Sequence, residues 1–256
     1  MKKIKAKKIY IIIIILLLIL SVFIIRKFNK YYVVDDRVEK VNTFENVDGA
    51  KAIGWLKVQG TNIDLPVLYY HEVVNISDPT NDIAWSYTKD NELADRTTIF
   101  SHNVLNVSKN PLIGDKNHKR FEQLMAYIYF DFVKENKYIQ YTIDGENYLY
   151  KIYGVSLKKT ESVEYETSDF SKKELKKYIE DTKKDSYFDF NIEVDENDKL
   201  LTLVTCTRFY GSTDEYSFVV DARKVRNNEF IDNYKVVENK NYKKVKELMK
   251  VEGDNA

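Results

Sequence analysis

Cysteine, proline and glycine are all scarce in this chain of 256 residues. It has one cysteine, three prolines and eight glycines, and its 40 basic and 40 acidic residues leave no formal net charge. A single cysteine excludes an internal disulfide, and the balanced charge gives no sign of a nucleic-acid partner. The low proline and glycine content, together with 20 tyrosines and 13 phenylalanines, favours a folded, strand-rich body over a disordered one.

One long apolar run stands near the N-terminus. Ile9–Ile25 carries no charge, and a helix of that length at about 1.5 Å per residue covers most of a hydrocarbon layer of about 30 Å. Five lysines precede the run, which predicts that its N-terminal side stays in the cytoplasm and that the rest of the chain lies outside. A cleaved signal peptide is the alternative, but no small-residue cleavage site follows. We therefore expect a basic segment over 1–8, a transmembrane anchor over 9–25 and a juxtamembrane linker over 26–34.

The rest of the chain is expected to form one domain over residues 35–235 and a charged tail over 236–256, because no repeat or interdomain linker interrupts it. The residues from His71 to Arg96 are polar and irregular, which predicts a loop with at most one helical turn. Hydrophobic spacing predicts the other elements. They are helices over Asp35–Val47 and Phe121–Tyr129, and strands over Ile53–Val58, Ile63–Leu68, Thr97–Phe100, Leu200–Thr205 and Phe218–Val220.

Two local sequence patterns predict structure more specifically than the spacing of apolar residues does. Tyr138–Ile143 and Tyr148–Val155 flank Asp144-Gly145, which predicts a β-hairpin. Ser171–Glu174 fits a capping box, and the residues that follow carry an apolar stripe with lysines on the other side. This pattern predicts a helix between the hairpin and the next strand.

The only cysteine, Cys206, follows the predicted strand Leu200–Thr205. A lone cysteine can be an inert buried thiol, an intermolecular bridge or a reactive group, and a reactive thiol needs a base or cation beside it. His102 follows another apolar strand, an element rigid enough to position it. His71 and His118 lie in polar segments and are expected on the surface. The residues alone suggest a pair of Cys206 with His102 and leave the inert thiol open.

Three motifs, in order along the chain, resemble the sortase family. Thr202-Leu-Val-Thr-Cys206 matches the family's TLxTC signature, Ile99–Asn103 is similar to its strand-end histidine motif, and Trp55–Val67 resembles its opening strand pair. The resemblance covers about residues 35–225 and implies a mainly β (α+β) fold, an eight-stranded sortase β-barrel with peripheral helices. The single N-terminal anchor and the helix-forming insert at Ser168–Asp185 are most similar to class B members.

The resemblance implies a cysteine transpeptidase at the cell membrane of a Gram-positive bacterium, with its catalytic domain outside the cell. Cys206 would attack the C-terminal sorting signal of an exported protein and form a thioester, with His102 as general acid and base. The acyl group would then pass to an amine of a peptidoglycan precursor or of a pilin lysine. The thioester conserves the energy of the cleaved peptide bond, so this transfer needs no ATP.

One residue of the family pattern is missing. Sortases carry an arginine on the strand after the cysteine, where it holds substrate and stabilises the oxyanion, but here Ser217 precedes the apolar triplet. Arg223 is a poor substitute, because six residues of strand place it roughly 20 Å from Ser217. The candidates to replace the missing arginine are Arg208, the Ser217 hydroxyl and the backbone N–H after Cys206. The missing arginine suggests one alternative, a catalytically weak sortase-fold binding protein. A second alternative is a membrane-anchored cysteine peptidase that hydrolyses its acyl-enzyme.

No cofactor or metal is expected. Four aspartates lie in one loop-rich region, and some sortases outside class B bind Ca²⁺, but a solvated acidic surface explains the aspartates more simply. These residues are Asp78, Asp82, Asp90 and Asp95.

Overall fold

The chain was analysed as a computed structural model, which describes residues 10–21, 34–45, 49–70, 82–88, 93–104, 117, 120–165, 170–210 and 215–253. It divides into two compact units. The first contains residues 1–33 with 230–233, and the second contains residues 34–229 with 234–256.

In the first unit, residues 10–21 form a helix whose isoleucine and leucine side chains are exposed. Over the described ranges, no helix is both long and apolar enough to cross a membrane. Residues 9 and 22–25, the ends of the expected anchor, lie outside the described residues. The anchor over 9–25 stays a prediction.

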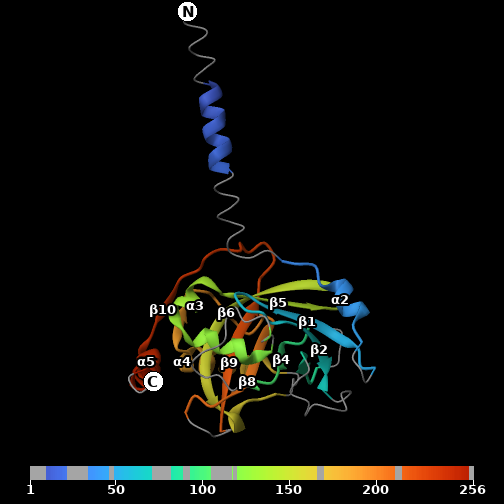
Figure 1. Cartoon of the computed structure of the whole chain (residues 1–256), viewed down its shortest axis with the longest axis vertical. Coiled ribbons are helices and arrows are strands. Elements are labelled where there is room, and N and C mark those ends of the chain that lie inside the picture. The colour runs from blue at the N-terminus through green and yellow to red at the C-terminus, as the bar shows by residue number, and fades with distance from the viewer. Residues whose placement is uncertain are drawn as a thin grey trace, which may run out of the picture. The chain divides into compact units, whose positions relative to one another are not determined.

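The second unit is built on a closed barrel of eight strands (Figure 1), which confirms the predicted barrel. β4 pairs in parallel with β8 and β2 with β3, and the other neighbours in the barrel are antiparallel. Around the barrel the strands run β1 (Ala52–Val58), β2 (Asp64–Tyr69), β3 (Ala84–Ser86), β4 (Arg96–Phe100), β8 (Leu200–Thr207), β9 (Tyr216–Lys224), β6 (Glu146–Lys159) and β5 (Tyr138–Ile143).

The predicted hairpin is confirmed as β5 and β6, and its turn shows why the sequence specifies it. Asp144 and Gly145 have φ values of 55° and 70°. Two successive positive φ values are those of the two-residue turn that matches the twist of antiparallel strands, and Asp-Gly is a favoured pair there. The turn therefore fixes the register from Tyr138↔Lys151 to Ile143↔Glu146.

The segment His71–Arg96, predicted as loop, needs a correction in its described part. Ala84–Ser86 forms β3, which is parallel to β2 and antiparallel to β4, and Arg96 is the first residue of β4. A three-residue strand that is buried along its whole length shows no alternation of polar and apolar residues. Its existence depends on neighbours that are far away in sequence.

Two predicted helices exist in altered form. The first is confirmed only over α2 (Val38–Thr43), whose N-cap residue is Arg37; just before it, the Asp36 carboxylate accepts a hydrogen bond from Val38 N at 3.0 Å. The second is the 3₁₀ helix η2 (Phe121–Ile128), followed by α3 (Phe130–Glu135). Every residue of η2 is buried, so the apolar pattern could not indicate which type of helix forms.

The segment between β6 and β8 holds the capped helix. After the short η3 (Thr160–Ser162), α4 (Lys172–Asp185) begins at Ser171, and both hydrogen bonds of the predicted capping box are present. Leu175 and Ile179 are buried against Tyr153 of β6. The helix therefore covers the outer side of the barrel next to β6, β8 and β9.

Residues 236–256, expected as a charged tail, contain two elements. β10 (Val236–Glu238) pairs with β7 (Phe188–Phe190), and α5 (Lys240–Gly253) follows. Tyr242 of α5 packs on Phe188, with ring centroids 4.8 Å apart. The many lysines of this segment indicated an exposed tail, but the side chains of Tyr242 and Val245 are buried, at 4% and 2% exposure.

Gly154 of β6 allows α4 to pack closely on the barrel. A Cβ at this position would lie 2.4 Å from Thr182 Cγ2 of α4. We expect Gly154→Ala to lower the free energy of unfolding by about 1–3 kcal/mol, the usual cost of overpacking. Urea denaturation measures it.

The matched control for this prediction removes the clashing methyl group. Thr182→Ser deletes Cγ2 and keeps the hydroxyl, so the double variant Gly154→Ala/Thr182→Ser should recover most of the lost stability. Equal stability of Gly154→Ala and the wild type would show that the close approach is not a constraint.

Candidate active site

Strands β4 and β8 bring the two predicted site residues together. They are parallel neighbours in which Phe100 lies opposite Val204. His102 stands two residues beyond Phe100, and Cys206 stands two residues beyond Val204. Because side chains alternate along extended chain, both residues point to the same side of the sheet.

Hydrogen bonds continue this register past the end of β4. The Ser101 N–H donates to Val204 O at 3.4 Å, and the Thr205 hydroxyl donates to Ser101 O at 2.9 Å. The Asn103 side-chain amide donates to Cys206 O at 3.1 Å. The backbone on both sides of His102 is thus tied to the strand that carries the cysteine.

His102 and Cys206 line one open cavity of about 230 Å³. Cys206 is the only exposed residue of β8, and the imidazole of His102 lies edge-on to the Trp85 ring, 5.0 Å between centroids. Low-polarity walls strengthen electrostatic interactions inside such a cavity. A thiol and an imidazole here suit nucleophilic acyl transfer. The remaining lining residues are Trp85, Tyr87, Phe100, Ser101, Tyr165, Val204 and Thr205.

Ser217 of β9 stands opposite the cysteine. Cys206 and Ser217 are partners in the antiparallel β8–β9 ladder, so their side chains lie on the same face. Ser217 is fully buried, and its hydroxyl lies 3.0 Å from that of Thr160. Its side chain therefore lies beside the cysteine, beneath the residues that line the cavity.

Neither arginine considered as a replacement lines the cavity. Arg208 follows β8 and is exposed. Arg223 lies opposite Leu200, six residues before Cys206 on β8, and is buried. Its guanidinium donates to both carboxylate oxygens of Glu229, at 2.5 and 2.7 Å. Arg223 therefore has a structural partner away from the cysteine.

Tyr165 is a cavity residue that the sequence did not reveal. Its ring packs edge-on against Phe100, 5.4 Å between centroids, and its hydroxyl interacts with the Ser217 side chain. Burial raises the pKa of this hydroxyl, the hydrogen bond with Ser217 lowers it in part, and the nearby Cys206 raises it further. Tyr165 lies in an irregular segment without a motif, so only the folded chain shows its position.

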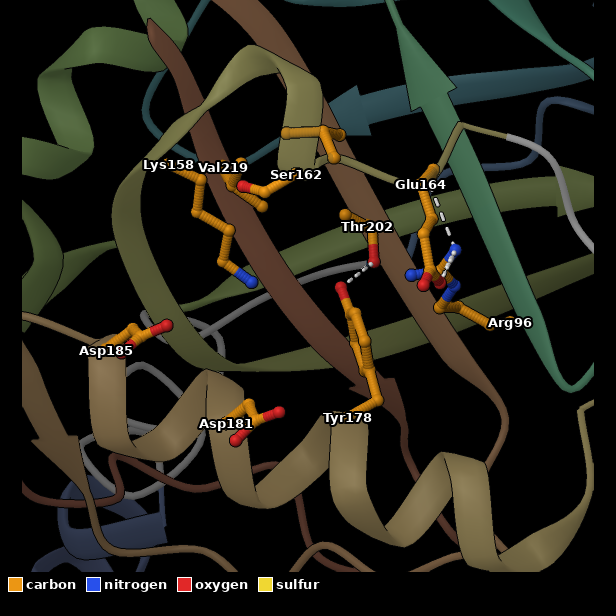
Figure 2. A pocket seen from close by; sticks show the side chains of 10 residues that line it. Arg96, Lys158, Ser162, Glu164, Tyr178, Asp181, Asp185, Thr202 and Val219 are labelled. Carbon is orange, nitrogen blue, oxygen red and sulfur yellow. Dashed lines mark hydrogen bonds and ion pairs between the residues drawn. The ribbon is translucent and has the colours of Figure 1, made fainter.

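A second cavity, of about 240 Å³, lies along the same face beyond the segment that carries Tyr165. Figure 2 shows Tyr178 reaching from α4 to Thr202, with Arg96 and Glu164 on one side and Lys158 on the other. Arg96 is 1% exposed, and its guanidinium lies over the Tyr178 ring at 4.5 Å. This cavity combines buried and exposed charges of both signs and contains neither Cys206 nor His102.

The remaining candidates can be placed only in part. His71 and His118 lie outside the described residues, as do Asp78 and Asp90. Among the residues that the structure describes, no group of three histidine, cysteine or acidic side chains is arranged to hold a metal ion.

A comparison with known protein families matches residues 56–225 to the sortase domain. Among curated proteins, sortase B of Listeria monocytogenes is 28% identical over 163 residues, which are 60% of this chain and 62% of that protein. Sortase B of Staphylococcus aureus is 23% identical over 177 residues, which are 66% of this chain and 68% of that protein. The match thus spans less than two thirds of the Listeria protein.

Solved structures show the same fold. The Staphylococcus aureus sortase B–substrate complex has a TM-score of 0.56 at 20% identity and covers 75% of this chain and 84% of that one. Clostridium perfringens sortase B has a TM-score of 0.53 at 22% identity and covers 68% of this chain and 93% of that one. The barrel is therefore shared with class B sortases.

The role of Arg223 is testable through acid denaturation. Burial raises the pKa of Glu229, but hydrogen bonds from Arg223 and Lys151 outweigh it and lower the pKa to about 2. A carboxylate with a depressed pKa stabilises the fold above its unfolded pKa of about 4.3, and this contribution is lost as pH falls toward 2. We expect Glu229→Gln to lower the free energy of unfolding at pH 7. Between pH 5 and 2, the free energy of unfolding of the variant should fall less steeply than that of the wild type, as measured by urea denaturation.

The control is Glu193→Gln, because the Glu193 side chain is 93% exposed in its ion pair with Arg226. The free energy of unfolding of Glu193→Gln should depend on pH as that of the wild type does. If Glu229→Gln lost as much stability on acidification as the wild type, the Arg223 pair would not stabilise the end of the barrel.

Proposed function

The chain belongs to the sortase family, and from this premise we propose that it is a class B-like cysteine transpeptidase acting on the C-terminal sorting signal of exported proteins. The observation that carries the proposal is the cavity shared by exposed Cys206 and His102 at the ends of two paired strands. Both residues come from the motifs that resemble the family. The shared cavity allows the thiol and the imidazole to act on one substrate.

In the first half of the reaction, the Cys206 thiolate attacks the carbonyl carbon of the scissile peptide bond. A C–S bond forms, and the π electrons move to the carbonyl oxygen. When the carbonyl re-forms, the C–N bond breaks and His102 gives its proton to the departing amine. The product is a thioester on Cys206.

In the second half, an amine of a peptidoglycan precursor or of a pilin lysine attacks the thioester. His102 takes a proton from the attacking nitrogen, the C–S bond breaks, and Cys206 leaves as thiolate. A new amide replaces the old one without net oxidation or ATP. Water in place of the amine would give hydrolysis.

Two other functions follow from specific observations. The open cavity admits water, which favours a peptidase that hydrolyses its thioester. The serine opposite Cys206, where the family pattern has arginine, favours a binding protein that retains the fold with little catalysis. The transpeptidase is preferred because the thiol is exposed and shares its cavity with a histidine.

The N-terminal run anchors the enzyme in the cytoplasmic membrane with the barrel outside. Support comes from the uncharged run Ile9–Ile25, the lysines before it, and the exposed apolar side chains of the helix over residues 10–21. We expect the full chain to stay in the membrane pellet after alkaline carbonate extraction, and the chain from Arg26 onward to be released. Release of the full chain would contradict an integral anchor.

The reaction is tested with the full chain in detergent, a quenched peptide library of LPxTG-like and NPxTN-like signals, and triglycine or acetyl-lysine amide as acceptor. We expect ligation and a thioester visible by intact mass. Cys206→Ala should abolish both, and His102→Ala should lower kcat by about 10²–10⁴-fold, the usual range for a general acid–base residue.

His71→Ala and His118→Ala are the matched controls and should keep wild-type rates. Cleavage without ligation would replace the transpeptidase with a peptidase. Absence of any covalent adduct, with peptide still bound, would favour the binding protein.

A further inference from the structure

Acyl transfer at Cys206 needs a hydrogen-bond donor for the oxygen that becomes negative. Such a donor acts best when it is fixed in a cavity of low polarity before the reaction starts. Among the described residues that line the cavity with Cys206, none is an arginine or a lysine. Arg223 is bound to Glu229, and Arg208 is exposed outside the lining.

The residue opposite the cysteine is too short and too deeply placed to serve by itself. Ser217 is fully buried, and its hydroxyl is already engaged with the Thr160 hydroxyl and with Tyr165. Directly opposed side chains on antiparallel strands have Cβ atoms about 4.5–5.5 Å apart. Ser217 is therefore better placed to position another side chain beside Cys206 than to contact the substrate itself.

Tyr165 is the group that Ser217 holds. Tyr165 lines the cavity with Cys206 and His102, its ring packs against Phe100, and its hydroxyl interacts with Ser217. Phe100 is on β4 and Ser217 on β9, so the phenol spans β8 between them. Tyr165 therefore connects the cavity lining to the residue opposite Cys206.

The backbone that presents Tyr165 is fixed on both sides of the cavity. Thr160 N donates to Glu215 O at 2.7 Å, next to β9. Glu164 O accepts hydrogen bonds from Arg96 at 3.0 Å and from Thr98 at 3.4 Å, both on β4. A donor on a segment held at two strands is positioned before substrate arrives, which is the condition for strong oxyanion stabilisation.

We propose that the Tyr165 hydroxyl, positioned by Ser217, donates the hydrogen bond that stabilises the oxyanion at Cys206. This inference rests on the proposed transpeptidase function. No bond to the phenol forms or breaks: the proton stays on the Tyr165 oxygen while the C–S bond forms, and His102 supplies the proton that leaves with the amine. Ser217 acts as a positioning residue.

The charge state of the phenol agrees with this role. Burial is the main reason that the pKa of Tyr165 is raised, so the hydroxyl keeps its proton across the working range of an enzyme. A protonated phenol can donate but cannot act as a base. Its contribution should therefore be the same at every pH at which the cysteine and histidine are active.

The central experiment compares Tyr165→Phe with Tyr216→Phe in the full chain, using the best peptide from the library. Tyr165→Phe keeps the ring against Phe100 and removes only the hydroxyl. We expect kcat for thioester formation to fall about 10²-fold with KM changed less than about threefold, as for loss of one oxyanion donor. Tyr216→Phe, next to Ser217 but on the opposite face of β9, should leave both constants unchanged.

Ser217→Ala tests the positioning role. We expect a loss of about tenfold in kcat, and Tyr165→Phe/Ser217→Ala should be no slower than Tyr165→Phe alone because the two residues act as one unit. The pH–rate profile of Tyr165→Phe should keep the acidic and basic limbs of the wild type at the same pH values, with only the maximum rate lowered. Near-ultraviolet circular dichroism and thermal unfolding show whether the variants are folded.

Each outcome decides between the claims. Equal rates for Tyr165→Phe, Tyr216→Phe and an active wild type overturn the role of Tyr165 and leave the transpeptidase intact, with the backbone N–H after Cys206 as donor. A wild type without acyl-enzyme on any library peptide overturns the proposed function and this inference with it. Multiplicative losses in the double variant would contradict positioning by Ser217.

Discussion

The parallel pairing of β4 with β8 is the interaction on which the candidate site depends. Its register places Phe100 beside Val204, so two residues further on the imidazole and the thiol meet in one cavity. A slip of one residue would turn one of the two side chains to the opposite face of the sheet. The register is held by the apolar residues on the other face of both strands, and the buried core therefore fixes catalytic geometry that lies outside it.

Other parts of the chain cover the outer face of β4 and β8. The insert between β6 and β8 covers it with α4 and with the segment that carries Tyr165, and residues of that segment line both cavities described above. Polar residues on this face pair with the insert and with each other: Tyr178 donates to Asp221 at 2.6 Å, and Thr202 donates to the same carboxylate oxygen at 2.8 Å. The insert therefore completes both the fold and the candidate site.

Local sequence patterns were sufficient where a structure depends on neighbours in the chain. The Asp144-Gly145 turn, the capping box at Ser171 and the strand before Cys206 are confirmed because each is encoded by a few adjacent residues. β3 was missed because a buried three-residue strand has no period. Tyr165 was missed because its position results from hydrogen bonds to β4 and β9, which no spacing in the sequence records. The sequence did indicate that Ser217 replaces an arginine, but not which residue Ser217 would hold.

Arg96 connects the insert to β4, the strand that precedes His102. Its guanidinium is buried between the rings of Phe170 and Tyr178, and it also binds Glu164 O. Detaching α4 would strip both rings from a buried cation and expose the Asp221 carboxylate at the same time. The insert and the two strands are thus expected to open as one cooperative unit, with similar protection of their amides from hydrogen exchange. The lifetime of the site is then set by this collective opening, and a substitution on the far side of α4 can shorten it without touching the cavity.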